Sequence, residues 1–240
     1  MKLHIFYSHY NVAGAGVLGH RPHWFDYEAC FTNLLNTIDG TDIVLHVVMD
    51  GRIDDNWISR YKHRYISHEI ITDHTMDSIT KQVYAVVKST PLNDNDLIYI
   101  LENDYVHVYG WVDKIFELFT SYTNLSYVGL YDHNDKYDNR LYGDLVSKIF
   151  TTPSHHWRTT VSTCGSYITT RRIFLEDYSV HIGVDIPVGD HHKWVYLNQT
   201  RNRFLITPVP GLSTHCVETL TSPCIDWKAI INKQYEQNIK

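Results

Sequence analysis

Two carboxylates, two residues apart, follow a run of strand-forming residues. In LIYILENDYVHVYGW, residues 97–111, the apolar run 97–101 predicts a buried strand, and Glu102 and Asp104 come directly after it. If the chain stays extended through Asn103, both carboxylates point to the same side and converge at an exposed strand end. Because two such groups repel each other, we expect a cation between them. Mg²⁺ and Mn²⁺ prefer oxygen ligands and bind phosphate, so the pair predicts a metal-assisted diphosphate site.

A third acid, Asp50, ends another run of strand-forming residues. It closes the segment DIVLHVVMDG, residues 42–51. In open α/β sheets, ligands bind outside the carboxyl ends of the strands, which favours a binding role for Asp50. Asp-Gly is also a common turn pair, and a turn residue remains the alternative at this position.

The elements that would position these acids alternate between strand-like and helix-like segments in the first half of the chain. Such alternation predicts an α/β domain with a mostly parallel, Rossmann-like central sheet flanked by helices. Helical periodicity is found at 24–38, 78–90 and 112–122, and strand-like runs at 3–8, 42–51, 64–71, 97–101 and 125–132.

The second half is less regular. Residues 147–174 predict a β-ribbon with a glycine turn, the segment from Asp190 predicts a helix, and 204–216 an extended segment. No linker or repeat divides the 240 residues, so we expect a single domain, 1–240.

Charge and hydropathy exclude two classes of partner. The net charge is -6, and no Lys/Arg-rich stripe is present, which argues against nucleic acid as a partner. No apolar segment approaches the ~18 residues of a membrane span, and the N-terminus has no cleavage pattern. We therefore expect a soluble, cytoplasmic protein with no membrane span.

Two other motifs argue against rival cofactors. GAGVLG, residues 14–19, matches a dinucleotide fingerprint, but a long loop precedes it and Arg21-Pro22 falls where the helix should run. Sixteen histidines suggest zinc, yet the chain has no HExxH and no paired CxxC motif. Neither an NAD site nor a zinc hydrolase is favoured.

Several short segments occur in an order that resembles the nucleotide-sugar-dependent glycosyltransferases of the GT-A fold. ENDY follows the central strand as the acid-x-acid motif of that fold does; VVMDG, TCGSY, VGDHH and GLSTHC follow the pattern of its other site segments. ENDY, LYDH and HHWRTT are also similar to small bacterial and viral proteins described as glycosyltransferase-like. The central motif residue here is Asn103, which adds no charge.

The resemblance implies that residues 1–110 bind the nucleotide, and that residues 111–240 bind the acceptor and complete the metal site. It also implies a role for each segment. Asp104 and His215 would bind Mn²⁺ or Mg²⁺, with Glu102 supporting them directly or through water. Asp190 would be the base of an inverting transfer, with a helix N-cap as the alternative role. The residues expected to contact the nucleotide or its sugar are Tyr7, Tyr10, Asn11, Asp50, Lys81, Glu102, Asn103 and Gly165.

The resulting prediction is a metal-dependent glycosyltransferase of the hexosyltransferase type. It would move a sugar from a nucleoside-diphosphate donor, with UDP favoured by the resemblance, to a glycan or other hydroxyl acceptor. Two alternatives remain open, a sugar nucleotidyltransferase and a carbohydrate-binding module without catalysis. Retention of configuration also remains open, because inversion depends on Asp190.

Overall fold

The structure is a computed structural model that describes residues 1–9, 20–50, 56–73, 75–187 and 189–238. Tyr10 and Asn11 lie outside the described residues. The helices and strands are β1 (Leu3–His9), α1 (Tyr27–Ile38), β2 (Ile43–Asp50), α2 (Asn56–Ser59), β3 (Ile66–Ile70), α3 (Met76–Ser89), β4 (Leu97–Glu102), β5 (Tyr105–His107), α4 (Trp111–Ser121), β6 (Tyr127–Val128), α5 (Asn139–Tyr142), β7 (Ile149–Thr152), β8 (His155–Thr160), β9 (Tyr167–Thr170), α6 (Arg171–Glu176), α7 (Tyr178–His181), α8 (Asp190–Arg201), β10 (Leu205–Val209), β11 (Ser213–His215) and α9 (Trp227–Asn238).

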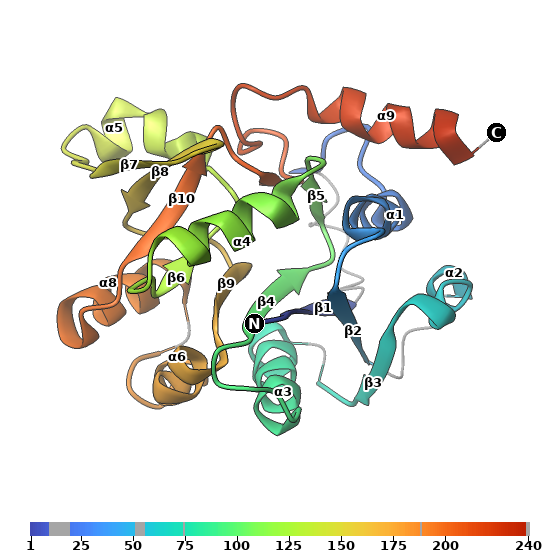
Figure 1. Ribbon diagram of the computed structural model, residues 1–240, viewed down its shortest axis with the longest axis horizontal. Helices are drawn as coiled ribbons and strands as arrows, with labels where there is room; N and C mark the ends of the chain where they lie inside the picture. Colours follow the sequence, from blue (N-terminus) through green and yellow to red (C-terminus); the bar gives the residue numbers. More distant parts are fainter. Residues whose placement is uncertain (10–19, 51–55, 74, 188, 239–240) are drawn as a thin grey trace.

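A nine-stranded sheet organises the described part of the chain, in the order β3-β2-β1-β4-β9-β6-β10-β8-β7 (Figure 1). β1 pairs in parallel with both β2 and β4, and β10 pairs in parallel with β6. β9 and β8 run opposite to the other strands. This architecture confirms the expected α/β fold with a mostly parallel central sheet.

Helices cover both faces of the sheet. On one face, α1 and α4 pack against the odd-numbered residues of β1, for example Leu3 and Ile5. On the other face, α3, α6 and α8 pack against the even-numbered Phe6. Because successive side chains of a strand point to opposite faces, a strand buried on both sides needs the continuous apolar pattern seen in β1 and β4.

The helix boundaries follow from local chemistry. Asp26 caps α1 by accepting a hydrogen bond from the backbone N–H of Ala29 at 2.8 Å, and Thr75 caps α3 in the same way. Gly110 precedes α4 with a φ of 77°, a left-handed conformation that favours glycine. Within the described residues, no helix is long and apolar enough to cross a membrane.

The strands of the second half depart from the predicted ribbon. β7 and β8 do form a hairpin, but its turn lies at Pro153-Ser154 rather than at a glycine. Gly165 instead leads into β9, which inserts between β4 and β6. Non-local pairing with β4 therefore decided the position of β9, and the local sequence pattern carries no signal for it.

Candidate functional site

The carboxyl ends of β1, β2 and β4 form one edge of the sheet, and the predicted acids lie along it. Ser8 of β1 is in register with Glu102 at the end of β4. Asp50 ends β2, is 2% exposed and accepts a hydrogen bond from the hydroxyl of Thr72 at 2.5 Å. The parallel arrangement thus places these polar groups where ligands of open α/β sheets bind.

A small second sheet joins Asp104 to His215. The chain turns at Asn103 and Asp104 instead of staying extended, and β5 then pairs with β11 so that Tyr105 is opposite His215. The His215 Nε2 atom lies 2.9 Å from Asp104 Oδ2. Asp104 is only 6% exposed, so the expectation of an exposed carboxylate was wrong, because β11 and the segment around residue 21 cover this turn.

Arg21 completes this cluster. Its guanidinium donates a hydrogen bond to Asp104 Oδ2 at 2.6 Å and another to the backbone carbonyl of Cys216 at 2.9 Å. We call Asp104, His215 and Arg21 the paired side of the site.

Ionisation of the paired side follows from its contacts. Burial opposes the charge on Asp104, but the attraction and hydrogen bond of His215, and then of Arg21, outweigh burial and hold the Asp104 pKa below its usual range. Burial likewise opposes the charge on His215, and Asp104 outweighs it, so the pKa of His215 is raised well above its ordinary value. Without a ligand, the two groups therefore behave as an ion pair.

Glu102 lies beside the paired side, with its carboxylate close to the backbone of Gly165. Burial and the nearby Asp104 charge raise the pKa of Glu102 to about 7. A Cβ atom on Gly165 would lie 2.7 Å from Glu102 Oε1, so a larger residue at this position would require the carboxylate to move. The predicted glycine loop therefore does contact the acid motif.

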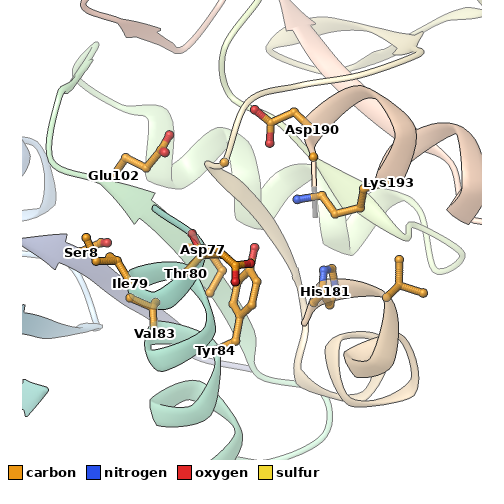
Figure 2. A pocket seen from close by; sticks show the side chains of 14 residues that line it. Ser8, Asp77, Ile79, Thr80, Val83, Tyr84, Glu102, His181, Asp190 and Lys193 are labelled. Carbon is orange, nitrogen blue, oxygen red and sulfur yellow. The ribbon is translucent and has the colours of Figure 1, made fainter. Parts of the chain in front are cut away.

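A cavity of about 200 Å³ opens on the other side of Glu102 (Figure 2). Ser8, Glu102 and Gly165 line it from the strand ends, and α3 and α8 supply the opposite walls. Asp190 and Lys193 project into it from the first turns of α8. We call Asp190 and Lys193 the open side of the site.

Asp190 is exposed at the mouth of this cavity. The helix N-cap is Gly189, so Asp190 is the first residue of α8 and not its cap. Surrounding protein atoms restrict hydration of the carboxylate and raise its pKa, against the attraction of Lys193. An accessible carboxylate beside a small cavity is suited to accept a proton from a bound hydroxyl group.

The structure places the remaining predicted residues in different surroundings. Tyr7 is buried, and its hydroxyl donates to the backbone carbonyl of Asn103 at 3.3 Å, which supports the turn of the acid motif. Lys81 is exposed and paired with Asp77 at 2.6 Å; Asp77 lines the cavity whereas Lys81 does not.

Two residues of the site were missed by sequence reasoning. Lys193 is three residues after Asp190 on a predicted helix and so shares its face, a signal that was available. Arg21 reaches the site from the segment before α1, and its sequence context gives no indication of a contact with Asp104.

The residues present fit a divalent ion in part. Asp104 Oδ1 is buried without a hydrogen-bond partner in the described residues, which leaves it free to bind a cation. To bind an ion, His215 would have to lose the Nε2 proton and the 2.9 Å contact with Asp104 Oδ2. No group of three or more His, Cys, Asp or Glu among the described residues could hold an ion by itself. The remaining ligands would have to come from water and substrate phosphate.

Comparisons with known proteins establish the fold. No family model matches the chain, and no curated protein matches it. The solved structure of CMP:2-keto-3-deoxy-manno-octonic acid synthetase in complex with CTP is similar over 100% of this chain and 99% of that chain, with a TM-score of 0.52 and 13% identity. The chain therefore has a GT-A-like nucleotide-sugar fold, as expected; at this identity the likeness concerns the fold alone.

Two further solved structures are similar at lower scores. S. aureus TarS matches with a TM-score of 0.46 and 10% identity, over 74% of this chain and 49% of that chain. A protein described as a nucleotide-diphospho-sugar transferase from Desulfovibrio desulfuricans G20 matches with a TM-score of 0.48 and 8% identity, over 85% of this chain and 78% of that chain.

Proposed function

We propose that the protein is a glycosyltransferase that moves a sugar from a nucleoside-diphosphate donor, with UDP as the nucleotide, to a hydroxyl acceptor. The observation that carries this proposal is the convergence of Glu102, Asp104 and His215 at the end of β4, next to a cavity that Asp190 lines. A diphosphate site beside a small cavity with an accessible carboxylate has the parts that glycosyl transfer requires.

Asp104 and His215 would hold Mn²⁺ or Mg²⁺, with Glu102 contributing directly or through water. When bound, the ion supplies Lewis-acid stabilisation of the diphosphate as negative charge develops on it. Arg21 donates to the same carboxylate as His215 and adds a fixed positive charge beside the leaving group. Asp50, at the end of β2, would contact the nucleoside, and the cavity would hold the sugar.

Asp190 would act as the base. As the acceptor oxygen forms its bond to the anomeric carbon, the bond from that carbon to the diphosphate oxygen breaks, and the nucleoside diphosphate leaves. The acceptor proton passes to a carboxylate oxygen of Asp190, which contributes ~10²–10⁴-fold. Attack from the side opposite the leaving group inverts the configuration of the sugar.

The experiment that tests this function is a screen of nucleotide sugars for release of nucleoside diphosphate, with Mn²⁺ and with a chelator. Hydrolysis of the donor by water gives a signal even before the acceptor is identified. Calorimetry with UDP alone, in Mn²⁺ and in chelator, measures binding of the nucleotide. We expect UDP to bind only when the metal is present. Binding of a free sugar that requires neither UDP nor Mn²⁺ would instead indicate a carbohydrate-binding module.

A sugar nucleotidyltransferase is the second candidate. The observation that favours it is Arg21, a cation from the segment after β1 that contacts the acid cluster and could neutralise a triphosphate. The two activities differ in product: a nucleotidyltransferase releases pyrophosphate from a nucleoside triphosphate and a sugar phosphate. Pyrophosphate release without nucleoside diphosphate release would replace the first proposal with the second.

A further inference from the structure

Lys193 is a largely buried residue whose ammonium forms no ion pair among the described residues. Its residue is 7% exposed, and its side chain lines the cavity with the ammonium turned toward the interior (Figure 2). The Nζ atom lies over the ring of Trp194 at 4.8 Å and over that of Tyr167 at 5.1 Å. It makes no hydrogen bond or ion pair with any residue that the structure describes.

Comparison with a second lysine shows that this is unusual in the molecule. Lys136 is also 7% exposed and also lies over an aromatic ring, that of Tyr142. Its ammonium, however, is paired with Asp135 at 3.2 Å. Lysine is rarely buried without a partner, because removing an ammonium from water is costly, and a cation–π contact offsets only part of that cost.

A second observation at the same cavity also points to a negatively charged ligand. α8 is twelve residues long and begins at Asp190, and its N-cap Gly189 has no side chain to accept a hydrogen bond from the first turn. Gly189 and Asp190 both line the cavity. Unpaired N–H groups and the positive end of a helix dipole favour an anion at this position.

The location of this site separates it from the diphosphate. The paired-side residues Asp104, His215 and Arg21 do not line the cavity. Glu102 lines the cavity and also lies next to Asp104 of the paired side. The cavity of about 200 Å³ is smaller than the ~300–1,000 Å³ of sites for drug-sized ligands, so it suits one sugar ring rather than a whole nucleotide sugar. Ser8, Asp77 and Thr80 in its lining can hydrogen-bond sugar hydroxyls.

We propose that the transferred sugar is an acidic one, whose carboxylate binds Lys193 and the first turn of α8. This inference rests on the proposed function and specifies its donor as a nucleoside-diphosphate uronic acid. The carboxylate supplies the anion that Lys193 lacks, and the neighbouring hydroxyl groups meet the polar residues of the strand ends and of α3.

The test is calorimetry at pH 8 with Mn²⁺, with UDP-glucuronate and UDP-galacturonate compared with UDP-glucose, UDP-galactose and UDP. We expect wild-type protein to bind a uronic acid donor roughly 10- to 100-fold more tightly than its neutral counterpart, the range for a hydrogen bond to a charged group. Lys193→Met should remove this preference and leave the affinity for UDP and the neutral donors unchanged. Lys193→Arg should retain most of it.

Lys88→Met is the matched control. Lys88 also lies over an aromatic ring, that of Tyr178 at 4.2 Å, but it is exposed and outside the lining of the cavity. This variant should leave all affinities unchanged. Thermal melts of each variant confirm that binding is compared between folded proteins.

Four results would overturn the inference. Equal wild-type affinity for acidic and neutral donors removes the carboxylate site. If Lys193→Met loses as much affinity for UDP as for the acidic donors, the lysine is a diphosphate ligand. If it loses equal affinity for neutral and acidic donors but none for UDP, the lysine is a general sugar contact. The proposed function survives in each of these cases. Absence of binding by UDP and every donor rejects the proposed function together with the inference.

Discussion

The two sides of the site differ in whether their charged side chains contact one another. On the paired side, Asp104 contacts both Arg21 and His215, at 2.6 and 2.9 Å. On the open side, Asp190 and Lys193 project into one cavity, but their side chains make no hydrogen bond or ion pair with each other or with any other described residue. The charged groups of the first side are in direct contact without a ligand, whereas those of the second side are not.

This difference separates two kinds of role. A carboxylate held by two partners in a buried turn has a fixed position, which suits it to orient a diphosphate or an ion. A carboxylate and an ammonium that face a cavity without partners can instead change their interactions as a substrate binds and reacts. Each prediction below removes a charge from one side and asks whether binding or turnover responds.

The largest effect is expected for Asp104→Asn. The loss of its charge leaves Arg21 and His215 without their anion and removes a metal ligand, so affinity for UDP with Mn²⁺ should fall on the order of 10³-fold. Calorimetry measures this loss. Asp132→Asn is the matched control, because Asp132 forms a similarly buried pair with Arg158 at 2.7 Å. Both variants should melt earlier, but nucleotide affinity should fall in Asp104→Asn alone; equal losses would make Asp104 structural.

Asp190→Asn should act on turnover rather than on binding. The amide keeps the shape of the side chain but cannot accept the acceptor proton, so turnover should fall ~10²-fold or more. Affinity for the donor and for Mn²⁺ should remain near that of the wild type, as measured by calorimetry beside steady-state kinetics. Lost donor binding with unchanged turnover at saturation would instead indicate a donor contact and favour a retaining mechanism.

His215→Gln tests the metal on the paired side. Loss of the imidazole ligand should raise the Mn²⁺ concentration needed for half-maximal activity by ~10-fold or more, with turnover at saturating metal less affected. A titration of donor hydrolysis with Mn²⁺ gives both values. If activity persists in chelator and does not respond to Mn²⁺ in either protein, Arg21 alone supplies the positive charge and the metal proposal fails.

A smaller effect is expected in a chain of three histidines, of which His4 alone has a carboxylate nearby, Asp96 at 4.0 Å. His46 Nε2 lies 3.2 Å from His4 Nδ1, and His46 Nδ1 lies 3.0 Å from His68 Nε2. Burial, and then His68 and His4, lower the pKa of His46 from 6.5 to about 3. The folded state therefore excludes a proton that the unfolded state binds below pH 6.5, so stability falls as the pH falls.

For His46 alone, the free energy of unfolding should decrease by about 0.7 kcal/mol between pH 7 and pH 6. Urea denaturation at the two pH values measures this change, and His46→Gln should reduce it. Asp104 on the paired side titrates in a lower pH range, because its pKa is held below the usual value of a carboxyl group. An unchanged pH dependence in His46→Gln would assign the acid sensitivity to other groups.

The agreement between sequence and structure is closest in the first half of the chain. The helices predicted at 24–38, 78–90 and 112–122 correspond to α1, α3 and α4, and the acid-bearing strands to β2 and β4. These elements are recoverable because each is specified by the periodicity and caps of its own residues. The division of the chain into two functional halves, and the assigned site roles, stay predictions.

What the sequence by itself determined was the identity and order of the chemical groups: an acid motif after a strand, a glycine loop, an acid opening a helix and a late histidine. The tertiary structure decided their partners. Pairing of β5 with β11 joined Asp104 to His215, residues 111 positions apart, and the segment before α1 added Arg21. The fold placed the Lys193 ammonium over the rings of Trp194 and Tyr167, where it forms no ion pair among the described residues. Periodicity is a local property of the chain, whereas these contacts depend on which distant segments share one edge of the sheet, and no local pattern encodes that.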